Sequence, residues 1–199
     1  MEVVIIKYNA GNIESVKNAL FRLGVRAEIT SDQEKIRQAD KVIFPGVGEA
    51  RTTMAYLKKE GLDKLIPDLK QPVLGICLGL QLMCSHTEEG DTGCLGIFEE
   101  KVKRFVPQPG MEYVTKVPHM GWNTITNLKS KLFDPSLENQ FVYFVHSYYA
   151  TVGEHTAAVS DYILPLSAAL HRDNFYATQF HPEKSGTVGA GILKNFLNL

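Results

Sequence analysis

One cysteine of this chain lies in the kind of turn that exposes a nucleophile. Cys77 is the middle residue of Gly-Ile-Cys-Leu-Gly at 75–79, directly after the apolar run Pro-Val-Leu at 72–74. A strand that enters a tight turn, with small residues two places on either side of a nucleophile, is typical of a nucleophile elbow, where glycines relieve crowding of a strained backbone. A helix beginning at Leu78 would direct free N–H groups at the sulfur and favour the thiolate. The alternative is a buried packing cysteine between two glycines.

A second segment supplies the base that cysteine chemistry needs. His181, Pro182 and Glu183 follow an apolar run that we expect to be a strand. A thiol nucleophile needs a group that removes its proton and later protonates the leaving group, and another that orients this base. Across the rigid proline, the Glu183 carboxylate can reach back to one ring nitrogen of His181. The alternative is a surface histidine beside an exposed glutamate.

A glycine-rich turn offers stabilisation for a developing negative charge. Pro-Gly-Val-Gly at 45–48 comes directly after the apolar run 42–44. In an open parallel sheet, ligands bind at the carboxyl ends of the strands, so this turn is expected beside the elbow. An N–H of the turn, with Val47 and Gly48 as candidates, and the N–H of Leu78 would then form an oxyanion hole. A plain β-turn is the alternative.

Two further segments suggest binding rather than catalysis. A strand at 143–146 opens into a polar turn, where Ser147 and Tyr148 can offer backbone groups to a small ligand, and His146 is interpreted as a structural histidine. The single tryptophan, Trp122, lies beside glycine and methionine in what we expect to be a polar loop at 117–123. It indicates either a binding surface or an aromatic packed at the rim of the molecule.

Strands and helices alternate in the first half of the chain. Strands are expected at 3–6, 25–29, 42–44 and 73–76, with helices over 11–23 and around 54–62 and a short helix capped by Ser31 or Asp32. Such alternation predicts a parallel sheet covered on both faces. The second half has more strand signals, at 102–106, 124–125, 141–145, 157–159 and 176–180, and a last helix after Ser185. The predicted fold class is α/β, with a mostly parallel central sheet flanked by helices and extra strands in the second half.

The bulk composition narrows the class of protein. The 199 residues are 44% hydrophobic and 22% charged, which predicts a single globular domain over 1–199. The net charge of -1 argues against binding nucleic acid or an anionic membrane. We find no apolar stretch long enough to span a bilayer and no signal peptide. The three cysteines lack metal-ligand spacing, so we expect a cytoplasmic protein without a metal site, in which Cys84 and Cys94 pack rather than form a disulfide.

Together these segments resemble class I (triad-type) glutamine amidotransferases and, within them, the glutaminase subunits of imidazole glycerol phosphate synthase. The elbow and His-Pro-Glu are motifs of the superfamily, whereas Pro-Gly-Val-Gly and His-Met-Gly-Trp-Asn point to the subfamily. The matching segments run in order through the whole chain, at 8–12, 45–48, 75–81, 88–90, 119–123, 143–149 and 181–185. The resemblance implies a flavodoxin-like fold.

The resemblance also implies an activity and a partner. The chain would hydrolyse L-glutamine with the triad Cys77, His181 and Glu183, without a cofactor, and pass ammonia to a (β/α)8-barrel cyclase in a heterodimer of histidine biosynthesis. Residues implied to hold the amino-acid end of glutamine are Gly46, Gly79, Gln81, Glu89, Ser147 and Tyr148. Residues implied at the interface with the cyclase are Asn12, Met120, Trp122, Asn123 and Lys184.

Two positions depart from the family pattern and keep other functions open. Lys7 and Asn9 stand where the family usually has an acidic residue and a glycine. A paralogous glutaminase that serves surface-sugar or pyridoxal phosphate synthesis is therefore an alternative. A thiol protease and a silent binding protein that only supports a partner are further alternatives. A narrow pocket for a free amino acid would exclude the protease, and the intact triad residues argue against the silent protein.

Overall fold

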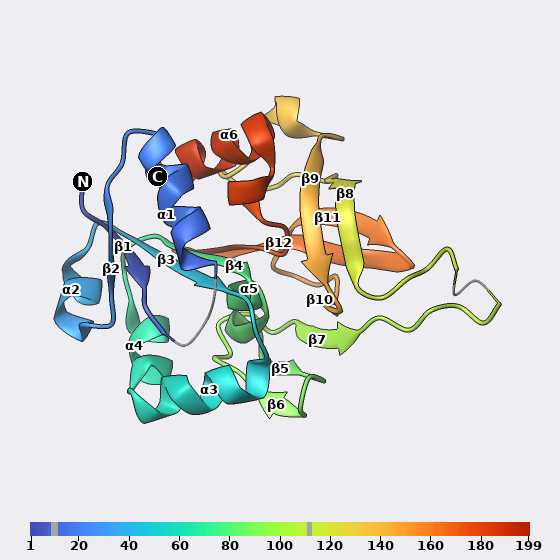
Figure 1. Ribbon diagram of the computed structural model, residues 1–199, viewed down its shortest axis with the longest axis horizontal. Coiled ribbons are helices and arrows are strands. Elements are labelled where there is room, and N and C mark those ends of the chain that lie inside the picture. Colours follow the sequence, from blue (N-terminus) through green and yellow to red (C-terminus); the bar gives the residue numbers. More distant parts are fainter. Residues whose placement is uncertain (9–11, 111–112) are drawn as a thin grey trace.

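A seven-stranded sheet forms the centre of the molecule in the computed structural model, which describes residues 1–8, 12–110 and 113–199 (Figure 1). The strands follow the order β11-β12-β13-β4-β3-β1-β2. From β13 to β2 each strand is parallel to its neighbour, whereas β11 and β12 join antiparallel. The strand bounds are β1 Val3–Ile6, β2 Ala27–Thr30, β3 Lys41–Gly46, β4 Val73–Cys77, β11 Thr156–Tyr162, β12 Leu164–Arg172 and β13 Phe175–Thr178.

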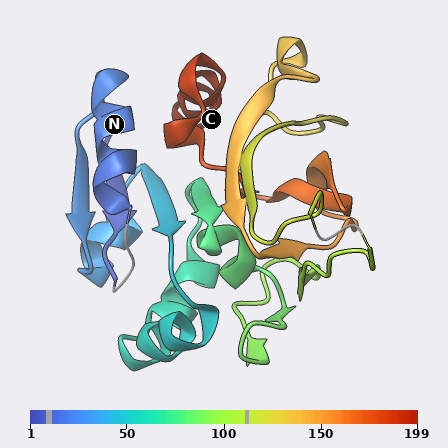
Figure 2. The same cartoon turned by 45° about the vertical axis from the view of Figure 1, so that its right-hand side comes forward.

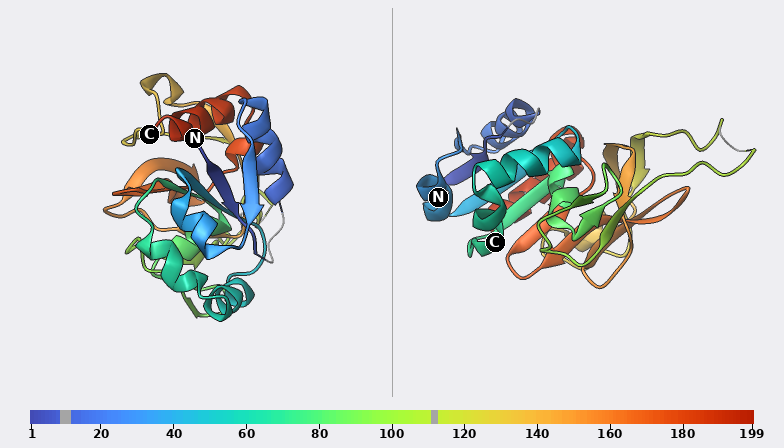
Figure 3. Two further views of the ribbon diagram at one scale, coloured as in Figure 1. Left: turned by 90° about the vertical axis from the view of Figure 1, so that its left-hand side faces the viewer. Right: turned by 90° about the horizontal axis from the view of Figure 1, so that it is seen from below.

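Helices cover both faces of this sheet because its inner strands are apolar on both sides. In β1, Val3 and Ile5 pack with α1 and α6, while Val4 and Ile6 pack on the opposite face with α2 to α5. Alternate residues of a strand point to opposite faces, so a continuous apolar run needs both layers. Seen from below, α3 lies across one face of the strands (Figure 3). The helices are α1 Ile13–Arg22, α2 Gln33–Gln38, α3 Ala50–Lys59, α4 Leu62–Asp68, α5 Leu78–Met83 and α6 Gly186–Leu197.

The second half adds two small sheets beside the carboxyl ends of the parallel strands. One is four-stranded, in the order β10-β7-β5-β6, and the other is the antiparallel pair β8–β9. Figure 2 shows β8 and β9 curving side by side away from the helical layers. Their bounds are β5 His86–Thr87, β6 Thr92–Gly93, β7 Lys101–Arg104, β8 His119–Thr124, β9 Phe141–His146 and β10 Tyr148–Ala150.

Two expectations about the second half are wrong. The segment expected as a polar loop forms strand β8 over His119–Thr124, because all six of its residues pair with β9, with His119 buried and Met120 and Trp122 exposed. Strand β12 over Leu164–Arg172 was not expected at all. It is joined to β11 by a turn in which Ile163, not glycine or asparagine, takes a φ of 63°, so the usual hairpin signal is missing.

Other expectations about local structure are close to the observed elements. Asp32 caps α2 by accepting hydrogen bonds from the N–H groups of Glu34 and Lys35. The helical segment around 54–62 is two helices, because Gly61 at φ 70° ends the first and starts the second. Asn9, at the departure from the family pattern, lies outside the described residues. In the described part of the chain, we find no helix with the length and apolarity that crossing a membrane requires.

Candidate active site

The elbow around Cys77 is built by the junction of β4 and α5. Cys77 is the last residue of the strand and takes φ 54° and ψ -104°, a strained conformation for a residue with a side chain. Its sulfur lies 4.0 Å from the Val145 carbonyl and 3.7 Å from Nε2 of Gln179, and the side chain is buried. The backbone therefore places the thiol at the tip of a tight turn.

Glycine at position 79 is required by the close approach of α5 to β3. A Cβ on Gly79 would stand 2.0 Å from the carbonyl oxygen of Phe44, which is far inside contact distance. A Cβ on Gly46 would likewise meet Cβ of Leu78 at 3.0 Å. These glycines bring the first turn of α5, with its free N–H groups, against the end of β3.

Gly79→Ala is expected to destabilise the fold by about 3 kcal/mol or more, since backbone must move to admit the methyl group. The matched control is Gly191→Ala in α6, where a Cβ meets nothing within 4 Å. That change should be neutral or stabilising by up to about 1 kcal/mol through helix propensity. Urea unfolding of the two variants measures the difference, and equal stability would contradict the packing argument.

His181 and Glu183 meet directly after β13. Nδ1 of His181 lies 2.7 Å from Oε1 of Glu183, and both side chains are buried. The short helical turn Pro182–Lys184 brings the carboxylate back to the ring, and Ser185 fixes the turn by donating its hydroxyl to the His181 carbonyl at 2.7 Å. The pair thus has the geometry of a base and the group that orients it.

The charges around His181 favour its protonated form. Burial lowers the pKa of the imidazole, but hydrogen bonds and charge interactions with Cys77 and Glu183 outweigh it and raise the pKa to about 9. Among the described residues, Nε2 has no hydrogen-bond partner of ordinary length, so this nitrogen is left for the sulfur of Cys77. An imidazolium beside a thiolate is the arrangement that cysteine nucleophiles use.

A third side chain, that of Asn12, contacts this pair. Asn12, expected at a partner interface, donates from Nδ2 to Oε1 of Glu183 at 2.5 Å, and the same nitrogen lies 3.5 Å from Nδ1 of His181. The contact spans 171 residues of sequence, so only the fold reveals it.

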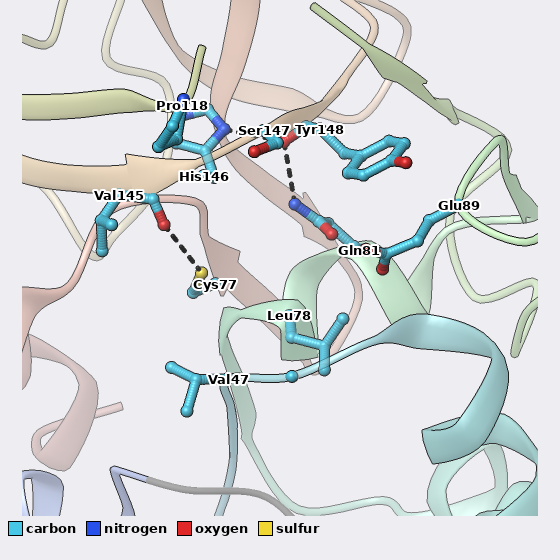
Figure 4. A pocket seen from close by; sticks show the side chains of 11 residues that line it. Val47, Cys77, Leu78, Gln81, Glu89, Pro118, Val145, His146, Ser147 and Tyr148 are labelled. Carbon is cyan, nitrogen blue, oxygen red and sulfur yellow. Dashed lines mark hydrogen bonds between the residues drawn. The ribbon is translucent and has the colours of Figure 1, made fainter.

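A pocket of about 290 Å³ opens over the sulfur (Figure 4). Cys77 and Leu78 lie at its base, with Gln81 and Glu89 on one side. The triad histidine and carboxylate lie behind it rather than in its wall. Of the residues predicted for glutamine and the oxyanion, those that line it are Val47, Gly48, Leu78, Gln81, Glu89, Ser147 and Tyr148; it is completed by Pro118, Val145 and His146, which were not predicted as ligands.

Two of the residues predicted to hold glutamine are not part of the pocket wall. Gly46 and Gly79 face each other across the junction of β3 and α5, where they permit close backbone packing. The motif predicted that both glycines lie near the site. It did not predict that they are needed because a Cβ at either position would clash with neighbouring atoms.

The polar groups of the pocket are already partly engaged. Nε2 of Gln81 donates to the carbonyl of Tyr148 at 2.9 Å (Figure 4). The same nitrogen also donates to Oε1 of Gln179 at 3.1 Å. The Glu89 carboxylate accepts from the N–H of Ala50 at 2.8 Å, and burial raises its pKa. A carboxylate at the mouth and carbonyls in the wall suit a ligand with a cationic amino group.

The turn predicted for the oxyanion reaches the sulfur. Gly46 pairs in register with Cys77, so the residues after it continue over the elbow. Gly48 has φ 142°, a conformation that residues with side chains rarely adopt, and a Cβ there would meet only Cδ2 of Leu78 at 4.0 Å. Val47, Gly48 and Leu78 therefore line the pocket beside Cys77, and their role as an oxyanion hole stays a prediction.

The residues predicted for a partner interface divide into two groups. Met120 and Trp122 are 65% and 56% exposed on the outer face of β8, and Lys184 is exposed. Asn12 and Asn123 are half-buried, and Asn123 donates to the Asp161 carbonyl at 2.9 Å. The structure therefore leaves apolar side chains of β8 exposed, and the interface itself stays a prediction.

A comparison with known families decides what this arrangement belongs to. The family described as glutamine amidotransferase class-I matches residues 4–199. The chain belongs to the class I glutamine amidotransferases. The resemblance predicted from the motifs is thereby confirmed, together with the enzyme class and the α/β fold with a mostly parallel sheet.

Curated relatives match this amidotransferase over its full length. It is 66% identical to the imidazole glycerol phosphate synthase subunit HisH of Bacteroides fragilis strain YCH46, covering 100% of both chains. Identity to the subunit of the same name from Haemophilus influenzae strain KW20 is 46%, covering 99% of this chain and 97% of the relative. Among solved structures, a putative GMP synthase protein from Thermoplasma acidophilum matches with a TM-score of 0.75 at 21% identity, over 100% of this chain and 93% of that one. That likeness shows the fold alone.

Proposed function

We propose that this chain is the glutaminase subunit of an imidazole glycerol phosphate synthase. The observation that carries the proposal is a cysteine at a strained elbow, placed with a buried His181–Glu183 pair, in a chain 66% identical over its whole length to a subunit of that name. It would hydrolyse L-glutamine to glutamate and ammonia.

The geometry supports a two-step acyl transfer. The Cys77 thiolate attacks the side-chain amide carbon of glutamine, and the oxyanion that forms accepts hydrogen bonds from the N–H of Leu78 and from the turn at Val47 and Gly48. His181, as imidazolium, gives its proton to the departing nitrogen, which leaves as ammonia. The same ring, now neutral, takes a proton from water, which attacks the thioester and releases glutamate.

The pocket wall supports recognition of a free amino acid. Glu89 offers a carboxylate for the α-amino group, and Ser147 and Tyr148 supply backbone groups on the opposite side. A pocket of about 290 Å³ lined by these groups matches the size of one amino acid, which favours glutamine over the peptide substrate of a thiol protease.

The proposed partner is a (β/α)8-barrel cyclase that receives the ammonia. At neutral pH free ammonia is mostly protonated and no longer nucleophilic, so the two active sites must be joined. The exposed side chains of Met120 and Trp122 on β8, with Lys184 nearby in the triad turn, support docking close to the pocket. A cytoplasmic location stays a prediction.

Growth of a histidine auxotroph tests the pathway. A strain that lacks its own glutaminase subunit should grow without histidine when it carries this chain, in medium low in ammonium so that free ammonia cannot substitute. The same strain carrying Cys77→Ala should not grow. Failure of the wild-type chain, with glutaminase activity intact in the purified protein, would favour a paralogue that serves another acceptor.

A change at Gly48 tests whether the oxyanion turn responds to the partner. Gly48→Val should lower the stimulation of glutaminase by the ligand-bound cyclase about tenfold or more while changing glutamine binding little, because valine restricts the peptide rotation that glycine allows. Gly96→Val is the control, since Gly96 also has a positive φ, of 67°, but is not part of the pocket wall. Equal losses of stimulation and of binding would count against a rotating turn.

A further inference from the structure

Two buried histidines, one in the pocket wall and one behind it, have no part in the reaction described above. His119 and His146 face each other across the β8–β9 pair, with Nδ1 of His119 and Nε2 of His146 3.1 Å apart. Both side chains are buried, and only His146 reaches the pocket. A hydrogen bond between two imidazoles requires one ring to donate and the other to accept. The direction of this bond therefore shows which nitrogen of each ring carries the hydrogen.

The inner end of the pair is fixed by a carbonyl. Nδ1 of His146 lies 2.7 Å from the carbonyl oxygen of Tyr148. A carbonyl only accepts hydrogen bonds, so Nδ1 of His146 carries the proton, and in a neutral ring Nε2 is then an acceptor. The same carbonyl also accepts from Nε2 of Gln81 at 2.9 Å.

The outer end of the pair is fixed by an amide. Asn123 donates from Nδ2 to the Asp161 carbonyl at 2.9 Å and accepts at Oδ1 from the N–H of Thr124 at 2.8 Å. These two bonds settle which side of the amide is nitrogen, and that nitrogen also lies 3.4 Å from Nε2 of His119. Nε2 of His119 is therefore an acceptor, and its Nδ1 carries the proton that it donates to His146.

Packing holds both rings in this arrangement. The His119 ring is stacked between Tyr162, at 4.0 Å and 10°, and Phe144, at 4.7 Å and 21°. Burial lowers the pKa of His119 to about 4. Burial, together with the neighbouring charges of His119 and His181, lowers the pKa of His146 to about 3 although the Tyr148 carbonyl opposes it. Both rings are neutral at physiological pH, as the directed chain requires.

We propose that His119 and His146 are positioning residues that hold the backbone of Ser147 and Tyr148 in place in the wall of the glutamine pocket. They do so through a series of hydrogen bonds in which Asn123 donates to His119, His119 to His146, and His146 to the Tyr148 carbonyl. The inference rests on the proposed function, since it gives this wall a role in holding glutamine. The polypeptide bends at Ser147 between β9 and β10, and Tyr148 begins the pairing of β10 with β7. Besides this pairing, the backbone accepts from the Phe105 N–H at the Ser147 carbonyl, at 3.0 Å, and from Gln81 and His146 at the Tyr148 carbonyl. Only the bond from His146 depends on a second buried ring.

Nitrogen-15 spectra of histidine-labelled protein test the direction of the chain without any assay of turnover. We expect both rings in the tautomer with hydrogen on Nδ1, and both neutral down to pH 5. A hydrogen on Nε2 of either ring, or a ring that protonates near pH 6.5, would overturn the proposal. Substitution of each histidine in turn by asparagine assigns the two signals.

A matched pair of variants tests the consequence for glutamine. Asparagine places its amide nitrogen about where histidine has Nδ1, whereas glutamine places it about where histidine has Nε2. His119→Asn therefore retains the donor to His146, and His119→Gln loses it, while both lose the stacked ring to a similar degree. In the complex with the cyclase we expect KM for glutamine to rise about tenfold in His119→Gln and less than about threefold in His119→Asn, with kcat changed less in both.

The outcomes separate this inference from the proposed function. Equal KM values in the two variants, or a loss confined to kcat, would overturn the positioning role while the wild-type activity stands. If the wild-type complex releases no glutamate, the proposed function fails, and the nitrogen-15 spectra still decide whether the directed chain exists. Thermal unfolding of both variants measures the stability loss that they share.

Discussion

Cys77→Ala is expected to lower the rate of glutamine hydrolysis by about 10⁴-fold or more, to the background of the assay. The sulfur is the atom that forms the thioester, and no neighbouring group can replace it as the nucleophile. The fold should persist, because the change removes a single sulfur atom and alanine keeps the same backbone restriction at φ 54°. Glutamate release by the variant in the presence of the cyclase measures the loss.

Cys94→Ala is the matched control for that experiment. Cys94 is a free cysteine, half-buried and outside the pocket wall, so its removal should leave the rate within about twofold of the wild type. Alkylation of the two variants before the assay adds a second comparison. Activity that is retained in Cys77→Ala, or lost equally in both variants, would contradict the assignment of Cys77 as the nucleophile.

His181→Ala should lower kcat by about 10³-fold, since the ring both protonates the departing nitrogen and activates water. Glu183→Gln should have a smaller effect and a distinctive pH dependence. The Glu183 carboxylate is one of the groups that raise the pKa of His181 to about 9, so its neutralisation lowers that pKa. Because the reaction needs the imidazolium, the alkaline limb of kcat/KM should move to lower pH in Glu183→Gln.

The pH profile of kcat/KM, measured from about pH 6 to about pH 10 for the wild type and Glu183→Gln, decides this point. An alkaline limb that stays in place, or moves upward, would show that Glu183 does not set the protonation of the base. Glu138→Gln is the control, because Glu138 is exposed at a turn outside the pocket wall, where it accepts from the N–H groups of Asn127 and Leu128. Its profile should match the wild type.

The same protonation predicts how stability depends on pH. The pKa of His181 is higher in the folded than in the unfolded chain. Protonation of His181 therefore stabilises the fold fully below about pH 6.5, and this contribution is lost as the pH rises through about 9. The pKa values of His119 and His146 are lowered in the folded chain, so these rings act in the opposite sense. Their contribution to the stability of the fold is lost as the pH falls below about 6.5. The fold is thus favoured most near neutral pH by these three groups.

Local patterns were sufficient to predict the elements that carry the triad. The run before Cys77 and the glycines around it indicated a strand, a tight turn and a helix start, all of which are observed. The order of apolar segments in the first half also predicted the parallel sheet. In each case the signal lies within a few neighbouring residues, where sterics and periodicity act directly.

Contacts between distant segments could not be read in the same way. Asn12 reaches Glu183 across 171 residues, and the paired rings of His119 and His146 depend on the register of two strands, one of which was expected to be a loop. The sequence pattern around a single polar residue does not indicate whether its side chain faces a partner or another part of the same chain. The hydrogen bonds of Asn12 to Glu183 and of Asn123 to the Asp161 carbonyl were therefore not predicted, and a place for these residues at an interface stays a prediction.

The measurement that tests the central claim most directly is glutamate release by the purified chain, alone and with a (β/α)8-barrel cyclase in the presence of its nucleotide ligand. The account predicts weak activity alone and strong stimulation when the cyclase and its ligand are both present. High activity alone that does not respond to the cyclase would contradict a partner-gated subunit of histidine biosynthesis and place the triad in another amidotransferase pathway.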